Sequence, residues 1–117
     1  MTLIALAFAA AIGGALRFAF EYKLPPVGPR AFPRATLIVN LLGTFVLGIV
    51  SVSNGDIKLI IGTGLCGALT TFSGVSLQLH RRIIANAWNS AIAYFAVTLI
   101  SGIIFAWLGI QLGKIIF

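Results

Sequence analysis

The stretch "GTGLCGALTTFSGV", residues 62–75, decides the fold, because it lies inside a long apolar segment but does not suit a continuous helix. Four of its fourteen residues are glycine, and threonine and serine stand where a membrane helix normally carries leucine. Glycine loses more backbone freedom than any other residue when it is fixed in a helix. A broken membrane helix is tolerated only where its freed backbone groups line a cavity or bind a ligand. The stretch therefore predicts a break in a membrane helix at a functional site.

The composition of the whole chain is that of an integral membrane protein. Of its 117 residues 60% are hydrophobic and only 9% are charged, and the mean hydropathy is +1.11. A water-soluble domain of this length needs a more polar surface. Apolar segments of about 18 residues or more are long enough to cross a bilayer. We expect one all-α domain over residues 1–117 with four spans, at about residues 2–20, 35–52, 57–79 and 86–112.

The basic residues flank these spans and predict the orientation of the chain. Five lie in the loops after the first and third spans, and two lie on the opposite side. This bias predicts that both termini are outside and the two basic loops are cytoplasmic. The net charge of +6 therefore indicates contact with lipid headgroups and not with nucleic acid. The residues counted are Lys23, Arg30, Arg34, Arg81 and Arg82 against Lys58 and Lys114.

Carboxylates are nearly absent, which narrows the possible functions. Glu21 and Asp56 are the only two, and both fall at the ends of predicted spans. A proton-coupled drug exporter needs an ionisable group inside the membrane, so the sequence disfavours that class. His80 stands at a membrane edge without a nucleophile or carboxylate beside it, so we expect no enzyme. The single cysteine, Cys66, excludes an internal disulfide.

Uncharged hydrogen-bonding residues are distributed over three of the spans. In the fourth span, spacings of four and three residues place three of them on one face. Each hydroxyl either bonds back to a carbonyl of its own helix, or joins two helices, or lines a pathway for an ion. The residues are Asn40 in the second span, Thr70, Thr71 and Ser73 in the third, and Tyr94, Thr98 and Ser101 in the fourth.

The predicted break and the residues near it fit the binding of ions. Exposed carbonyls at a break suit a hard cation, whereas hydroxyls and the N-terminus of the next half-helix suit an anion. Asn40 must be paired in an apolar site, and it has two N–H groups to offer an anion. Phe72 presents an electropositive ring edge, or it packs against lipid or other side chains. Arg17 either reaches the membrane interior or extends to the interface.

Three motifs resemble one known family, the Fluc (CrcB) fluoride channels of microbes. They are "GGALRF" at 13–18, "TLIVNLLGTFVLG" at 36–48 and "GLCGALTTFSG" at 64–74, in that order. The resemblance implies a passive fluoride-selective channel in the cell membrane that lets cytoplasmic fluoride escape. It also implies an antiparallel dimer of four-helix subunits with two narrow pores and a structural sodium ion at its centre, which is not transported.

The resemblance assigns roles to the residues already singled out. Gly67 and Thr70 would contact the sodium ion through their carbonyls. Phe72 would be the first of two phenylalanines in the pore, Asn40 the pore amide and Arg17 the basic residue near the vestibule. The remaining residues of the expected anion pathway are Thr71, Ser73, Tyr94, Thr98 and Ser101.

One departure from the family pattern concerns the second pore phenylalanine. The family continues "TTFSTF", whereas this chain has Gly74 and Val75 at the last two positions. Valine offers no electropositive ring edge to an anion. Together with the unequal loop charge, this predicts a heterodimer with an oppositely oriented homologue. Two alternatives are a mainly structural subunit that completes its partner's pore, and a small multidrug or metabolite exporter.

Overall fold

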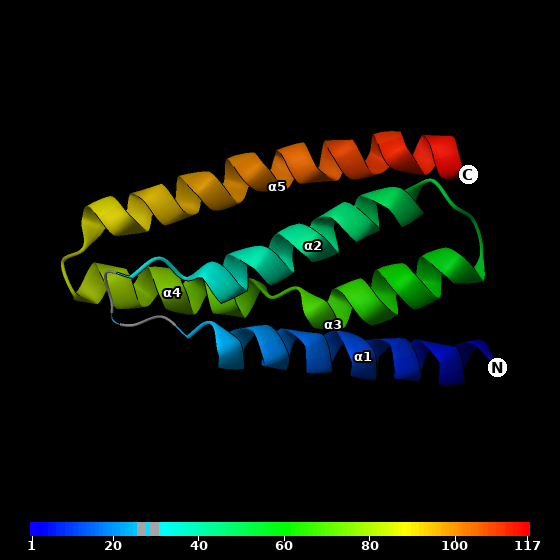
Figure 1. Ribbon diagram of the computed structural model, residues 1–117, viewed down its shortest axis with the longest axis horizontal. Helices are drawn as coiled ribbons and strands as arrows, with labels where there is room; N and C mark the ends of the chain where they lie inside the picture. Colours follow the sequence, from blue (N-terminus) through cyan, green and yellow to red (C-terminus); the bar gives the residue numbers. More distant parts are fainter. Residues whose placement is uncertain (26–27, 29–30) are drawn as a thin grey trace.

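The computed structural model describes residues 1–25, 28 and 31–117 as helices joined by short connections. One element, η1, is a π-helix, and the others are α-helices. No β-strand occurs in these ranges. The elements are α1 (Thr2–Lys23), α2 (Arg34–Ser51), η1 (Lys58–Cys66), α3 (Gly67–Leu69), α4 (Phe72–Ile84) and α5 (Trp88–Ile116) (Figure 1).

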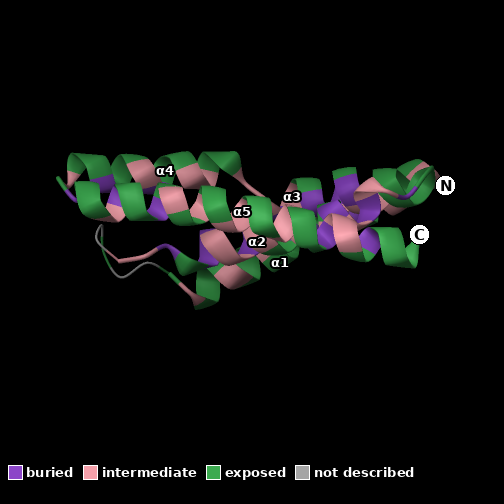
Figure 2. Cartoon of the chain, turned by 90° about the horizontal axis from the view of Figure 1, so that it is seen from above, coloured by how far each residue is buried: buried purple, intermediate pink, exposed green. Residues whose placement is uncertain are grey.

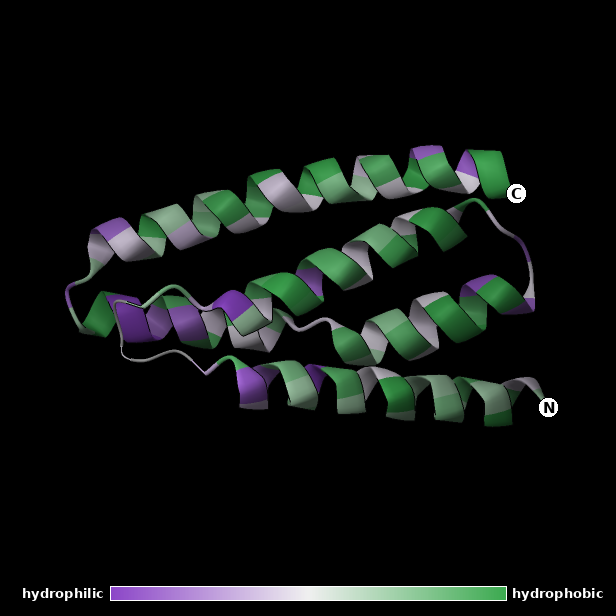
Figure 3. Cartoon of the chain, in the orientation of Figure 1, coloured by the Kyte–Doolittle hydropathy of each residue, from purple (hydrophilic) through white to green (hydrophobic). Residues whose placement is uncertain are grey.

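Four helical segments are long and apolar enough to cross a membrane, which confirms the predicted all-α, multi-pass membrane class. Three are α1, α2 and α5, and the fourth is the run Lys58–Ile84, which contains η1, α3 and α4. Figure 3 shows apolar residues along most of these segments, with hydrophilic residues concentrated in α4 and at the adjoining ends of α1, α2 and α5.

The third segment extends beyond the residues predicted for it. We expected a span over 57–79 closed by the basic residues at 80–82, but α4 continues through them to Ile84. The chain then reverses at Asn86, whose φ is +56°. Asn86 N–H donates to the Ile83 carbonyl at 3.0 Å, and Ala87 N–H donates to the Arg82 carbonyl at 2.8 Å. Asparagine tolerates this left-handed backbone conformation. The helix therefore ends just before Asn86, and not at the basic residues as predicted.

The other bounds differ by smaller amounts. Helix α1 runs on past residue 20 to Lys23, and α2 covers Arg34–Ser51 where residues 35–52 were expected. Helix α5 begins at Trp88 and reaches Ile116, beyond the predicted end at residue 112. Arg30, counted in the predicted loop charge, lies outside the described residues.

The helices form an elongated bundle with extents of 48 × 28 × 19 Å. Helix α2 packs mainly against α5, and α1 packs against η1 and α3. Both termini lie at one end of the bundle (Figure 1). Buried residues are confined to narrow strips between the helices, and much of the apolar surface is exposed (Figure 2). This is the pattern expected of a chain whose outer face meets lipid.

Glycines bring α2 and α5 into backbone contact. A Cβ atom built on Gly48 would lie 3.1 Å from the Gly109 Cα, and one on Gly109 would collide with the Phe45 carbonyl. Small residues allow such approach in lipid, where no hydrophobic force drives helices together. Gly13 and Gly43 likewise lie at helix contacts. Gly14 and Gly102 differ, because a Cβ atom built on either would meet no atom of another helix within 4 Å.

We expect Gly109→Ala to destabilise the bundle relative to Gly102→Ala. Both substitutions replace a glycine in α5, so both gain the same helix propensity, but only the first inserts a methyl group into a backbone contact. Overpacking of this kind costs about 1–3 kcal/mol. Denaturant unfolding in detergent, followed by circular dichroism, measures the difference. Equal midpoints for the two variants would contradict the α2–α5 contact.

Candidate functional site

The site is built around two extended residues between α3 and α4. Thr70 has φ −80° and ψ 157°, and Thr71 has φ −150° and ψ 121°. Thr70 closes α3, because its N–H and its hydroxyl donate to the Cys66 carbonyl at 3.0 and 2.9 Å. Thr71 opens α4 as its N-cap, since its hydroxyl accepts a hydrogen bond from Gly74 N–H at 3.0 Å. The two threonines thus supply partners that helix ends require.

Asn40 holds this extended segment from α2. Its Nδ2 donates to the Thr71 carbonyl at 3.2 Å, and its Oδ1 accepts from Thr71 N–H at 2.7 Å. Both backbone groups of Thr71 are therefore paired without a helix or a sheet. One N–H of the Asn40 amide is used in this way, and the amide has a second N–H to offer.

The helix α2 comes close to the segment because of Gly43. Asn40 and Gly43 are three residues apart and share a face of α2. A Cβ atom on Gly43 would collide with Cγ2 of Thr70. The asparagine and the glycine of "NLLG" therefore act together. Gly43 leaves space for the Thr70 side chain, and the Asn40 amide pairs with the backbone of Thr71.

A groove of about 360 Å³ opens beside the extended segment, and we call it the Phe72 groove. Phe72 begins α4 and is 85% exposed, so its ring is not part of the packed core. Asn40 and four threonines are the polar residues of a lining whose other members are apolar. The lining residues are Asn40, Thr44, Leu47, Thr70, Thr71, Phe72, Val75, Phe95, Thr98 and Leu99.

Several predicted site residues lie outside the groove. The Ser73 hydroxyl shares a hydrogen bond of 3.0 Å with that of Thr71, and the Ser101 hydroxyl donates to the Val97 carbonyl of its own helix. Arg17 is half-buried on α1, and Gly67 is exposed at the start of α3. Tyr94 is fully buried. Of the predicted face of α5, only Thr98 lines the groove.

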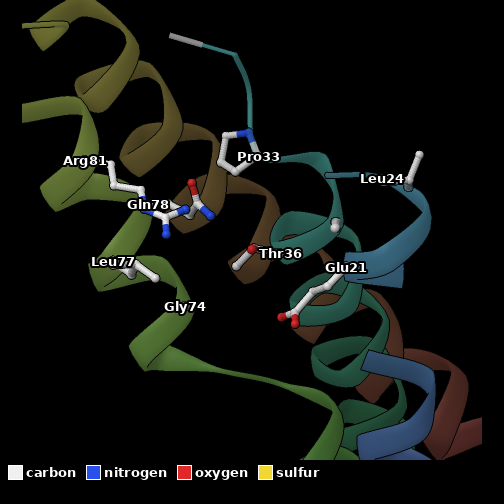
Figure 4. Close-up of a pocket in the computed structure, with 9 residues that line it drawn as sticks. Glu21, Leu24, Pro33, Thr36, Gly74, Leu77, Gln78 and Arg81 are labelled. Carbon is white, nitrogen blue, oxygen red and sulfur yellow. The ribbon is translucent and has the colours of Figure 1, made fainter. Parts of the chain in front are cut away.

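A second hollow, the Glu21 pocket, has a volume of about 220 Å³ and lies between α1, α2 and α4 (Figure 4). It carries charges of both signs, Glu21 from α1 and Arg81 from α4, with Gln78 and Thr36 between them. Gly74 also lines it, whereas Phe72 and Val75 line the groove, so the two hollows flank the first turn of α4. The pocket was not predicted, because its walls come from three separate segments.

Arg82 is the largest departure from the sequence analysis, which placed it in a basic loop. It is 0% exposed, although it lies in the last turn of α4. Its guanidinium donates to the carbonyl and the side-chain oxygen of Gln78, at 2.9 and 3.0 Å, and to Ser90 Oγ at 3.2 Å. It also donates to the Ala31 carbonyl. The spacing of four residues from Gln78 was the available signal, since such residues are neighbours on a helix.

Comparison with known proteins decides the family of the chain. The model of a family described as "CrcB-like protein, Camphor Resistance (CrcB)" matches residues 4–110. The chain belongs to the CrcB family. Residues 4–110 include the whole of the extended segment, the Phe72 groove and the Glu21 pocket.

Curated relatives in the CrcB family carry the name of an ion channel. The chain is 41% identical over 85 residues to "Fluoride-specific ion channel FluC 1" of Geobacillus kaustophilus, covering 71% of this chain and 73% of the relative. It is 35% identical over 114 residues to "Fluoride-specific ion channel FluC" of Acinetobacter baumannii strain AYE, covering 92% and 90%. It is 37% identical over 106 residues to "Fluoride-specific ion channel FluC 2" of Bacillus cereus, covering 88% and 89%.

We expect Asn40→Ala to destabilise this CrcB chain at the extended segment. The substitution leaves the N–H and the carbonyl of Thr71 without their partner. A buried polar group left unpaired costs about 1–3 kcal/mol. Denaturant unfolding measures the global effect, and amide exchange at Thr71 measures the local one. Asn89→Ala, at an exposed asparagine of α5, is the matched control; if both variants behave like the unchanged chain, the Asn40 contact does not hold the segment.

Proposed function

We propose that this chain is a subunit of a fluoride-specific ion channel through which fluoride leaves the cytoplasm passively. The Phe72 groove carries the proposal, because it brings Asn40, Thr98 and an exposed aromatic ring together beside an extended backbone. The names of the CrcB-family relatives support it.

The chemistry of the groove suits a small anion that has lost its water. Fluoride needs hydrogen-bond donors in place of that water, and Asn40 has a second N–H to offer. The edge of the Phe72 ring adds a weakly positive contact. Neither group carries a full charge, so an ion that binds is also able to leave, which conduction requires. An ion path lined by neutral groups also agrees with the absence of carboxylates among the groove residues.

We further propose that the extended segment lies near the middle of the membrane and supports a structural sodium ion. Thr70 and Thr71 fall near the centre of the segment Lys58–Ile84. Carbonyls of unwound membrane helices are suitable ligands for sodium. Gly67 is exposed and Thr70 half-buried, which is compatible with a shared ion between two subunits. The carbonyls of these two residues would hold the ion, as the sequence analysis expects.

The open groove favours a dimer, and we propose from the family resemblance that its two subunits are antiparallel. Phe72, Phe95 and Leu99 border the groove and expose large apolar area beside its polar groups. A second subunit over this face would enclose the ion path and exclude lipid. The membrane surrounding it would be the cell membrane of a microbe.

A heterodimer is the form of the dimer that we favour. Val75 lines the groove where the family pattern has a phenylalanine, so a partner that carries the second ring would complete one pore. Relatives named FluC 1 and FluC 2 are compatible with paired subunits. The charge argument is weaker than the sequence count indicates, because Arg82 is buried and does not face lipid headgroups. The proposal therefore depends mainly on Val75.

Fluoride efflux from liposomes, followed with a fluoride electrode, tests the proposed function. We expect efflux from liposomes that contain this chain with the second CrcB-family chain of the same organism, where it has one. Phe72→Leu should reduce the rate by up to about tenfold, since an edge contact of an aromatic ring is worth about 0.5–1.5 kcal/mol. Phe8→Leu is the control, because Phe8 is also exposed, at 68%, but lies on α1 outside the groove. Liposomes that leak no more fluoride than empty ones, with and without the second chain, would refute the function.

Val75→Phe tests the heterodimer. We expect the unchanged chain alone to conduct slowly and the variant alone to conduct faster, because the substitution restores a ring edge on the groove. The same efflux assay measures both. Rapid efflux from the unchanged chain alone, with no gain from Val75→Phe, would show that no partner is needed. Slow efflux from both, with rapid efflux only beside the homologue, would indicate a mainly structural subunit.

A further inference from the structure

The buried Arg82 joins its own helix, α4, to the start of α5 and to the connection before α2, which is far away in the sequence. Its guanidinium bonds to Gln78 in α4, to Ser90 near the start of α5 and to the Ala31 carbonyl in the connection before α2. All of these acceptors are neutral, so hydrogen bonds to dipoles, and not an ion pair, orient the planar guanidinium. A buried charge solvated only by dipoles is costly to a fold.

The side chain that this arrangement positions is Tyr94. The guanidinium carbon of Arg82 lies over the Tyr94 ring, 5.6 Å from its centroid. Phe32 meets the same ring edge-on, with centroids 5.6 Å apart and an interplanar angle of 82°. Phe32 follows Ala31, whose carbonyl accepts from Arg82. Arg82 thus contacts the ring directly and also anchors the connection that carries the second contact.

The Tyr94 hydroxyl is buried, and among the described residues Thr98 is the one hydroxyl that interacts with it. Tyr94 is 0% exposed, and neither its hydroxyl nor that of Thr98 makes a hydrogen bond of normal geometry to a described residue. The two side chains do interact, because Thr98 lies one turn further along α5. Buried hydroxyls without partners are rare in folded proteins and mark places where a ligand or water binds. Thr98 also lines the Phe72 groove.

We propose that Arg82 is a positioning residue for anion conduction. It fixes the Tyr94 ring so that the buried hydroxyl of Tyr94 stands next to that of Thr98, ready to donate to the permeating anion. Arg82 acts through Tyr94 and does not itself touch the ion. The inference deepens the proposed function and depends on it, but the orientation of the ring can be measured separately.

A double-mutant cycle between Arg82 and Tyr94 tests the coupling. We expect Arg82→Gln to reduce fluoride efflux by about tenfold, as expected when one hydrogen bond to an ion is lost. Tyr94→Phe keeps the ring and removes the hydroxyl, and we expect it to cause a similar loss. In the Tyr94→Phe background, Arg82→Gln should have little further effect. Equal losses in both backgrounds, or no loss from Arg82→Gln alone, would overturn the proposal.

Ring motion gives a readout that requires no conduction. The chain has only two tyrosines, so Tyr22→Phe leaves Tyr94 as the sole reporter for deuterium NMR with ring-labelled tyrosine in bilayers. We expect Arg82→Gln to increase the flip rate of the Tyr94 ring, and an unchanged rate would count against the proposal even if efflux falls. Arg81→Gln, at the exposed neighbouring arginine, is the matched control and should leave the flip rate unchanged.

Two further arms keep the outcome interpretable. If Arg82→Gln does not fold, Arg82→Lys replaces it, because lysine keeps the charge but lacks the planar fork. The same coupling with Tyr94→Phe is expected, and additive losses would again contradict the proposal. If the unchanged protein conducts no fluoride with any partner, the proposed function fails; if it conducts and the cycle is additive, only the role of Arg82 fails.

Discussion

Two hydrogen bonds between Asn40 and Thr71 are the constraint on which the rest of the structure depends. A backbone that leaves the helical conformation inside lipid loses partners that no water replaces. The Asn40 side chain restores both partners at a single residue. With Thr71 held in this way, α4 begins at Phe72 and directs the ring outward. The position of the groove therefore follows from one amide on the neighbouring helix.

The all-α class and the four membrane-spanning segments could be predicted from local features of the sequence. Hydropathy marks four spans because each one must cross the same apolar thickness. The stretch 62–75 predicts a break, because glycine, threonine and serine have low helix propensity. Asn40 stood out because an unpaired amide is costly in an apolar segment. Each of these signals depends only on a residue and its neighbours in the chain, so it can be recognised without knowledge of tertiary contacts.

The features that were missed depend on tertiary contacts. Arg82 looks like a loop residue because its sequence neighbours are basic, but its acceptors come from residues 31, 78 and 90. The polar face of α5 was predicted from helical spacing alone. In the structure Phe32 packs against Tyr94 at one end of this face, whereas Thr98 lines the Phe72 groove. Gly14 and Gly102 look like contact residues because glycine often is one, yet no neighbouring helix lies near them.

The residues around the extended segment are uncharged, and the nearby buried charge is the Arg82 guanidinium, which contacts the Tyr94 ring. Around the extended segment the described groups are an amide, hydroxyls and an aromatic edge, and in the channel that we propose they would hold an anion loosely enough to release it. The buried guanidinium lies one layer away, behind Tyr94. In the proposed channel, this arrangement would separate the groups that contact the ion from the charge that orders them.

The most direct test of this account is the distance between bound fluoride and labelled side chains in bilayers. Dipolar recoupling between ¹⁹F of the ion and ¹³C or ¹⁵N labels, in frozen samples, reports contacts at Phe72 and at the Asn40 amide. We expect dephasing at both labels in the conducting protein, and none at Phe8 on the outer face of α1. Dephasing at neither Phe72 nor Asn40, in samples that conduct fluoride before freezing, would contradict the account.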